Sequence, residues 1–86
     1  MKIIFQEIFT KQFKRLTKSQ KQPVADVIVL FAEDPMHDSL RNHPLRGKWA
    51  TYRSITADDN LRLHYRAIDK DNALFVAVGI HDELYK

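Results

Sequence analysis

One stretch of the sequence decides the fold: LRLHYRAIDKDNALFVAVGI, which spans residues 61–80. From Leu61 to Arg66 apolar residues alternate with basic ones, and this period of two is typical of a half-buried strand. The polar run Asp69–Asn72 predicts a turn. Leu74–Ile80 is nearly all apolar, which predicts a central strand covered on both faces. The stretch therefore predicts two neighbouring strands joined by a short turn.

Upstream of these strands the sequence predicts a strand and then a helix. Met1–Phe5 is a short apolar run and predicts a first or edge strand. Phe9, Phe13 and Leu16 recur at i, i+4 and i+7, which places them on one helical face with lysines opposite. The residues that follow, Thr17–Ser19, are expected to break this helix.

A second helix is expected to follow, with Ser19 as its N-cap. Because Pro23 is also suited to a first helical turn, the residue at which this helix begins is not fixed by the sequence. The dipeptide Asp34-Pro35 is expected to end it. Its apolar stripe has helical spacing and consists of Val24, Val27, Ile28 and Phe31.

The middle of the chain contains one more predicted strand. Residues 36–48 are polar and irregular, Trp49–Ile55 is rich in strand-forming residues, and Thr56–Asn60 is turn-rich. Together these elements predict a single α+β domain over residues 1–86, in the order β-α-α-β-β-β. We expect the helical hairpin to pack on one face of a small, mainly antiparallel sheet.

This arrangement has a consequence for the strand at residues 61–66. If its apolar residues pack under the helices, then Arg62, His64 and Arg66 point to the open face. They would form a positive surface that contains a titratable group. The alternative interpretation, that this is only the solvated outer face of a small sheet, is equally open at this point.

Composition narrows the possible classes of protein. The 86 residues carry a net charge of +3 and no cysteine, which excludes disulfides, thiolate nucleophiles and zinc–thiolate sites. The sequence pI of about 9.3 favours polyanionic partners, nucleic acid foremost. No signal peptide and no stretch long enough to span a membrane are found, so we expect a cytoplasmic chain without a membrane partner. The basic residues form two sets, one of Lys11, Lys14, Arg15, Lys18 and Lys21, the other of Arg41, Arg46, Lys48, Arg53, Arg62 and Arg66.

The four histidines do not have the spacing of a zinc motif. They are His37, His43, His64 and His81, and neither a glycine-rich phosphate loop nor a nucleophile elbow accompanies them. A metal site formed by His43, His64 and His81 is an alternative that the sequence does not exclude but does not favour. We therefore expect no metal and no cofactor.

Histidine, arginine, lysine and tyrosine are the side chains that metal-free RNA cleavage requires. One group must take the proton of the ribose 2′-hydroxyl, another must protonate the leaving 5′-oxygen, and fixed cations must stabilise the phosphorane. Histidine titrates near neutral pH and can carry out either proton transfer. Arginine binds phosphate through a two-pronged fork.

Four blocks of the sequence, in the right order and spacing, are similar to the RelE/ParE toxin superfamily, within it the YafQ branch. They are NHPLRGKW at residues 42–49, YRS at 52–54, LRLHYR at 61–66 and VGIHDELY at 78–85. The resemblance implies the β-α-α-β-β-β fold and the cleavage of mRNA in the ribosomal A site. The amino-terminal half matches the family in layout only.

When the functional residues of the family are carried over to the matching positions of this sequence, the resemblance implies four catalytic residues. His81 would be the general acid or base and His43 its counterpart. Arg62 would support the transition state. Tyr85 would stack on or orient a base. For each residue a purely structural role is the alternative: shaping a loop for His43, capping the chain end for His81, a surface ion pair for Arg62 and covering the core for Tyr85.

The sequence also departs from the family pattern. Thr56 stands where relatives have a further histidine, and Asn60-Leu61 where they have Asp-Trp. We infer that His64 could replace one of the missing acid/base groups, because it alternates onto the same face as Arg62. Trp49 and Tyr52 are assigned to packing. The residues expected to bind RNA are Arg46, Lys48, His64 and Arg66.

The partners follow from the same resemblance. It implies a cognate antitoxin, in a heterotetramer or a higher complex, that covers the basic face near Arg62 and His81 or the first helix. Operator DNA would be bound only through that antitoxin. Two alternatives are a ParE-like toxin that inhibits DNA gyrase and a catalytically weak toxin that acts as a binding module.

Overall fold

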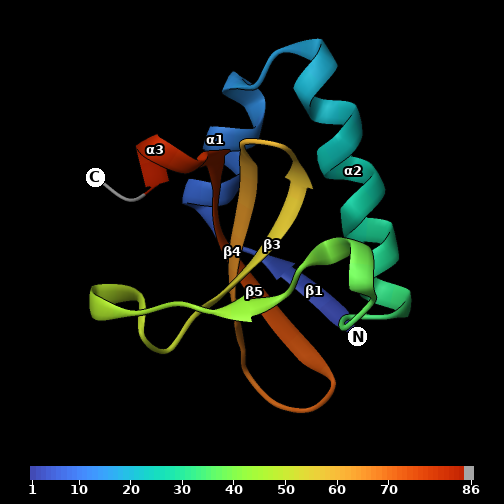
Figure 1. The fold of residues 1–86 in the computed structure, drawn as a ribbon. Coiled ribbons are helices and arrows are strands. Elements are labelled where there is room, and N and C mark those ends of the chain that lie inside the picture. Colours follow the sequence, from blue (N-terminus) through green and yellow to red (C-terminus); the bar gives the residue numbers. More distant parts are fainter. Residues whose placement is uncertain (85–86) are drawn as a thin grey trace.

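The computed structural model describes residues 1–84, apart from the side chains of residues 82 and 83. A strand and a helical hairpin come first, and four strands and a short helix follow (Figure 1). The elements are β1 (Lys2–Phe5), α1 (Glu7–Arg15), α2 (Lys18–Glu33), the 3-10 turn η1 (Asp38–Leu40), β2 (His43–Pro44), the 3-10 turn η2 (Gly47–Trp49), β3 (Arg53–Asp58), β4 (Leu61–Ala67), β5 (Asn72–Ile80) and α3 (His81–Leu84).

The strands form one sheet in the order β1-β5-β4-β3-β2. β3, β4 and β5 are the predicted antiparallel meander, and β1 lies parallel to β5 with Ile3 beside Ala73. β5 is thus flanked by strands on both sides. Its side chains from Phe75 to Val78 are buried on both faces of the sheet. The predicted α+β class and the central position of this strand are confirmed, and the two-residue strand β2 is an addition.

Both long helices pack on one face of the sheet, as predicted. Phe9 of α1 and Val24 and Phe31 of α2 are buried, and the remaining stripe residues are partly buried. The helix α2 ends at Glu33, and Asp34 is its C-cap. In residues 1–84 no helix is long and apolar enough to cross a membrane.

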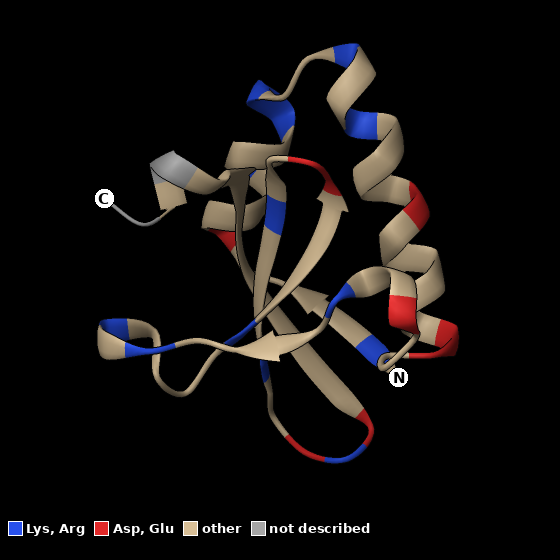
Figure 2. Cartoon of the chain, in the orientation of Figure 1, with Lys and Arg blue, Asp and Glu red and all other residues tan. Residues whose placement is uncertain are grey.

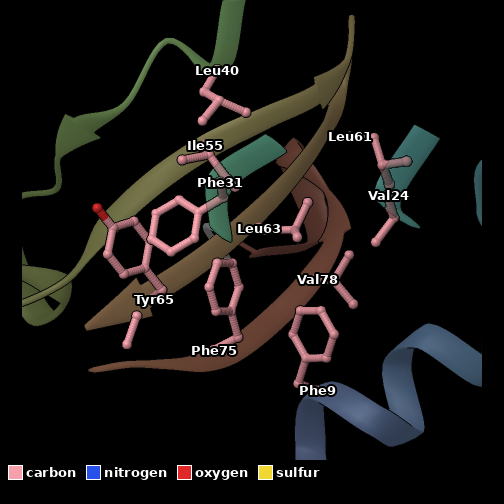
Figure 3. Close-up of a cluster of buried hydrophobic side chains, with 11 residues drawn as sticks. Phe9, Val24, Phe31, Leu40, Ile55, Leu61, Leu63, Tyr65, Phe75 and Val78 are labelled. Atoms are coloured by element: carbon pink, nitrogen blue, oxygen red, sulfur yellow. The ribbon is translucent and has the colours of Figure 1, made fainter. Parts of the chain in front are cut away.

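The core between the helices and the sheet is built around three aromatic rings (Figure 3). The Phe31 ring lies edge-on to both Tyr65 and Phe75, with centroid distances of 4.7 and 5.1 Å. Tyr65 and Phe75 stack at 5.2 Å across neighbouring strands. Phe31 is fully buried, so it joins α2 to two strands at once.

A bulge in β5 changes which side chains face outward. Tyr65 pairs with Phe75 and His64 with Ala77, so Val76 is the extra residue. Val76 and Ala77 are buried in a second, smaller apolar cluster, together with Leu84. Partly buried Trp49, Tyr52 and Leu74 pack against that cluster, which confirms the packing role assigned to Trp49 and Tyr52. The outer face of the sheet is therefore partly covered and not open along its whole length.

Two predicted boundaries are wrong by a few residues. The N-cap of α2 is Thr17 instead of Ser19, and it forms a capping box with Gln20. The third strand covers residues 53–58 instead of 49–55, because residues 47–52 form η2 and a turn. In both places local propensity pointed to the right element and hydrogen bonding fixed a different end.

The capping box gives a stability prediction. Thr17→Ala removes the side-chain acceptor of the Gln20 backbone N–H and should lower the free energy of unfolding by about 1 kcal/mol. Urea unfolding followed by circular dichroism measures this change. Ser19→Ala is the matched control and should cost less, because Thr17 occupies the cap; equal losses would contradict the assignment.

Candidate active site

The strand register places two of the predicted site histidines in one row. His43 of β2 lies opposite Ser54 of β3, Ser54 lies opposite His64 of β4, and His64 lies opposite Ala77 of β5. Side chains of directly opposed residues project from the same face of a sheet. The row therefore runs across the outer face, the face that the long helices leave uncovered.

The prediction that His64 lies on a solvated surface is wrong. Its side chain does point to the outer face, but it has no exposed area. The indole of Trp49 lies against the imidazole at a centroid distance of 4.7 Å, in an edge-to-face arrangement. The turn after β2 folds over β4 and covers the ring. Strand alternation gave the direction of the side chain but not what packs on it.

Burial sets the charge of His64. Removal from water, with smaller contributions from the charges of His43 and then His81, lowers the pKa of His64 from 6.5 to about 4. The imidazole of His64 is neutral at pH 7 and therefore supplies no positive charge to a phosphate, contrary to the expectation for this strand.

The pKa of His64 predicts how stability depends on pH. The unfolded chain keeps the ordinary pKa, so between pH 6.5 and about 4 it binds more protons at this residue than the folded chain. The free energy of unfolding should therefore fall as the pH drops through this window. Urea titrations at several pH values should show a flatter profile for His64→Gln. His37→Gln, which removes an exposed histidine, should keep the slope of the parent, and an unchanged slope in His64→Gln would refute the assignment.

His43 and His81 are both exposed, His43 at the edge-strand end of this row and His81 directly after the end of β5. His43 is exposed in the edge strand β2, and its Nδ1 lies 2.8 Å from the carbonyl oxygen of Arg41. His81 is exposed as the first residue of α3. The backbone N–H of His81 donates to the carbonyl of Asn60 at 2.8 Å, which ties the end of β5 to the turn before β4. The imidazoles of His43 and His81 are thus accessible to solvent, whereas that of His64 is buried.

Arg62 lies one row further along the outer face, opposite Thr56 and Gly79. Its guanidinium donates to three backbone carbonyls of the β3–β4 turn, those of Asp58 at 2.7 Å, Asp59 at 3.0 Å and Leu61 at 3.2 Å. The structure thus gives Arg62 a turn-stabilising role, which differs from the surface ion pair considered above. The side chain remains half-buried.

The other predicted site residues lie at different distances from the histidine row. Arg46 and Lys48 are exposed on the turn that covers His64, and this turn contains blue segments, the colour of Lys and Arg, in Figure 2. Arg66 is exposed on β4, two residues beyond His64 on the same face. Tyr85 lies outside the described residues. The structure therefore places His43 and His64 in one row of the outer face, Arg62 in the next row, and His81 directly after the end of β5.

Sequence reasoning did not single out Ser54 or Asn42. Ser54 is fully buried between the two histidines of the row, and a strand predicted at 53–58 would have placed it on the outer face. Asn42 forms three side-chain hydrogen bonds to distant parts of the chain, for which no sequence pattern exists. No cluster of three or more His, Asp or Glu side chains that could hold a metal ion is found in the described part of the chain.

Two helices on one face of a five-stranded mixed sheet form the fold of small RelE/ParE-like toxins. The crystal structure of YafQ from E. coli strain BL21(DE3) matches with a TM-score of 0.83 at 22% identity, over 98% of this chain and 97% of that one. The E. coli DinJ–YafQ toxin–antitoxin complex matches at 0.79 and 23%, over 98% and 96%. A metal-bound toxin from Helicobacter pylori matches at 0.77 and 26%, over 98% of each chain.

The family model of the bacterial toxin YafQ, of type II toxin–antitoxin systems, matches residues 1–86. The chain belongs to this family of toxins. No curated protein matches it in sequence.

Proposed function

We propose that this toxin is a metal-independent endoribonuclease that cleaves mRNA in the A site of the ribosome. The observations that carry the proposal are that His43 and His64 share one row of the outer face and that His43 and His81 are both exposed to solvent. Two accessible imidazoles that both reach the scissile phosphate would take up and deliver a proton in one reaction. Because its substrate would be mRNA on the translating ribosome, the toxin would act in the cytoplasm.

The reaction needs no group beyond these side chains and the RNA. The ribose 2′-oxygen attacks the adjacent phosphorus while one histidine takes the 2′-hydroxyl proton. The bond from phosphorus to the 5′-oxygen breaks, and the other histidine protonates that oxygen. The products are a 2′,3′-cyclic phosphate and a 5′-hydroxyl. His64, buried and neutral, would support the two outer rings and not take part in proton transfer at neutral pH.

Cations near the row would stabilise the charge that develops on the phosphorane oxygens. Arg46 and Lys48 extend from the turn beside His43 and would contact the RNA backbone, and Arg66 would lengthen this positive strip. Arg62 holds the β3–β4 turn with its Nη atoms. That turn receives the backbone N–H of His81, so Arg62 would also support the transition state by fixing His81. Tyr85 is proposed to stack on a base.

A cleavage assay on translating ribosomes tests this function. Ribosomes are programmed with a defined message, the purified chain is added, and the 5′ ends of the fragments are mapped by primer extension. We expect one cut within the A-site codon and no cut when ribosomes are left out. An intact message, with gyrase stalled on DNA in a parallel assay, would favour the ParE-like alternative instead. An intact message, together with normal growth when the chain is expressed alone, would favour the alternative of a catalytically weak toxin that acts as a binding module.

The cognate antitoxin is proposed as the second partner, and the E. coli DinJ–YafQ complex supports this proposal. An acidic or amphipathic segment would cover the basic face near Arg62 and His81, or α1. Lys and Arg also gather at the junction of α1 and α2 (Figure 2), which extends the second of these surfaces. Operator DNA would be bound only through the antitoxin, in a heterotetramer or higher complex. Absence of a complex with the neighbouring gene's product in gel filtration would remove the proposal.

A further inference from the structure

The backbone directly before His43 has an unusual conformation. Arg41 has a φ of 50° and lies in the left-handed region, and it is the one non-glycine residue among those described with a positive φ. Side chains other than glycine, asparagine and aspartate rarely adopt this region, because Cβ approaches the carbonyl oxygen. The conformation persists only where the surroundings hold it.

Arg41 is the C-cap of η1, where its backbone N–H donates to the carbonyl oxygen of Asp38 at 3.1 Å, and the side chain of Asn42 holds the chain on the other side of Arg41. Its Nδ2 donates to the carbonyl oxygen of Pro35 at 2.9 Å and to the hydroxyl of Tyr65 at 2.7 Å. Its Oδ1 accepts from Nε of Arg53 at 2.7 Å. The bonds reach the loop after α2, the core side of β4 and the first residue of β3. Asn42 therefore fixes the chain at the entrance to β2 from three directions.

The Tyr65 hydroxyl makes this anchor rigid. Its ring is buried in the aromatic core between Phe31 and Phe75, and its oxygen lies at the margin of that cluster (Figure 3). Movement of Asn42 would break a hydrogen bond to a side chain that cannot follow. The position of Asn42 is thus coupled to the packing of the helices on the sheet.

The consequence reaches the imidazole of His43. Its Nδ1 lies 2.8 Å from the carbonyl oxygen of Arg41, and a carbonyl oxygen can only accept a hydrogen bond. Nδ1 therefore carries the proton. In the neutral ring this leaves the lone pair on Nε2, because one nitrogen donates and the other accepts. The left-handed conformation of Arg41 aims its carbonyl at this ring.

We propose that Asn42 is a positioning residue, which holds Arg41 in the left-handed conformation and so fixes His43 as its Nδ1–H tautomer. Nε2 is then the nitrogen of His43 that exchanges a proton with the 2′-hydroxyl or the 5′-oxygen of the RNA. This last step rests on the proposed ribonuclease function, whereas the tautomer itself does not. Arg41 contributes through its backbone, and its guanidinium is not required.

The tautomer can be measured directly by long-range ¹H–¹⁵N NMR of the intact chain labelled at histidine. At a pH where the ring is neutral, we expect a protonated Nδ1 and an unprotonated Nε2 for His43. Asn42→Ala should shift this resonance pair toward the opposite tautomer. Asn72→Ala is the matched control, because Asn72 bonds only within its own turn, to Asp69; it should leave the His43 signals in place.

A second pair of variants guards against a loss of folding in Asn42→Ala. Arg41→Gly removes the guanidinium but accepts the positive φ without strain, so it should keep the Nδ1–H tautomer. Arg41→Val strains the same backbone and should change the tautomer. A His43 that is protonated at Nε2 in the parent chain, or signals that stay the same in Asn42→Ala and Arg41→Val, would overturn the proposal.

The ribosome assay then separates this inference from the function on which it rests. If the parent cleaves mRNA, Asn42→Ala should reduce kcat by at least tenfold, with little change in KM. Equal kcat values for the parent and a tautomer-shifted Asn42→Ala would refute the role of Nε2. If the parent does not cleave, the ribonuclease function fails, and the NMR result decides on the positioning role by itself.

Discussion

Replacing His81 with alanine should slow mRNA cleavage on the ribosome by about 10²–10⁴-fold, the usual contribution of one acid/base group. His43→Ala should have an effect of the same size. Both rings are exposed, so each removal takes away the proposed proton acceptor or donor without opening the core. Single-turnover rates on ribosomes with a defined A-site codon measure the loss.

Two controls make the His43 and His81 result specific. His37→Ala removes an exposed histidine beside η1, which is outside the row, and should cut at the rate of the parent. The double variant of His43 and His81 should lose far less than the product of the two single losses, because both groups act in one step. Parent-like rates in both single variants would show that cleavage, if present, uses other groups.

The largest expected effect on stability comes from Phe31→Ala, which should lower the free energy of unfolding by about 3–5 kcal/mol. Phe31 is fully buried and contacts the rings of Tyr65 and Phe75. Its loss leaves a cavity where α2 meets two strands. Natural domains have only about 5–15 kcal/mol in total, so the variant should be partly unfolded at 37 °C. Urea unfolding at 25 °C measures the difference.

The same helix offers a matched control for this stability prediction. Val29 is 60% exposed on α2, and Val29→Ala should change the free energy of unfolding by no more than about 0.5 kcal/mol. A loss of similar size in both variants would mean that α2 does not pack on the sheet as described. The Phe31 variant should also broaden the NMR signals of His43, since Tyr65 anchors Asn42.

The sequence was most informative where periodicity reports burial. The alternation from Leu61 to Arg66 and the apolar run from Leu74 to Ile80 predicted β4, β5 and their place in the sheet. The helical stripe that ends at Phe31 predicted the face of α2. These patterns arise because a buried face must be apolar at the spacing that its secondary structure imposes.

The sequence was least informative about what covers the outer face. Alternation placed His64 there correctly, but only the fold shows Trp49 packed over it. The β-bulge at Val76 and the capping of the β3–β4 turn by Arg62 are tertiary features as well. Hence the shared role of His43 and His81 stays a prediction from a resemblance to a family, and the charge state of His64 could not be predicted at all.

The central claim is that the RNA's own 2′-hydroxyl is the nucleophile and that histidines move the protons. It is tested most directly with two messages that differ only by a 2′-deoxynucleotide on the 5′ side of the cut in the A-site codon. We predict that the all-ribose message is cut to a 2′,3′-cyclic phosphate and that the deoxy message stays intact on the same ribosomes. Equal cutting of both messages, or a fragment ending in a 3′-hydroxyl, would contradict this account.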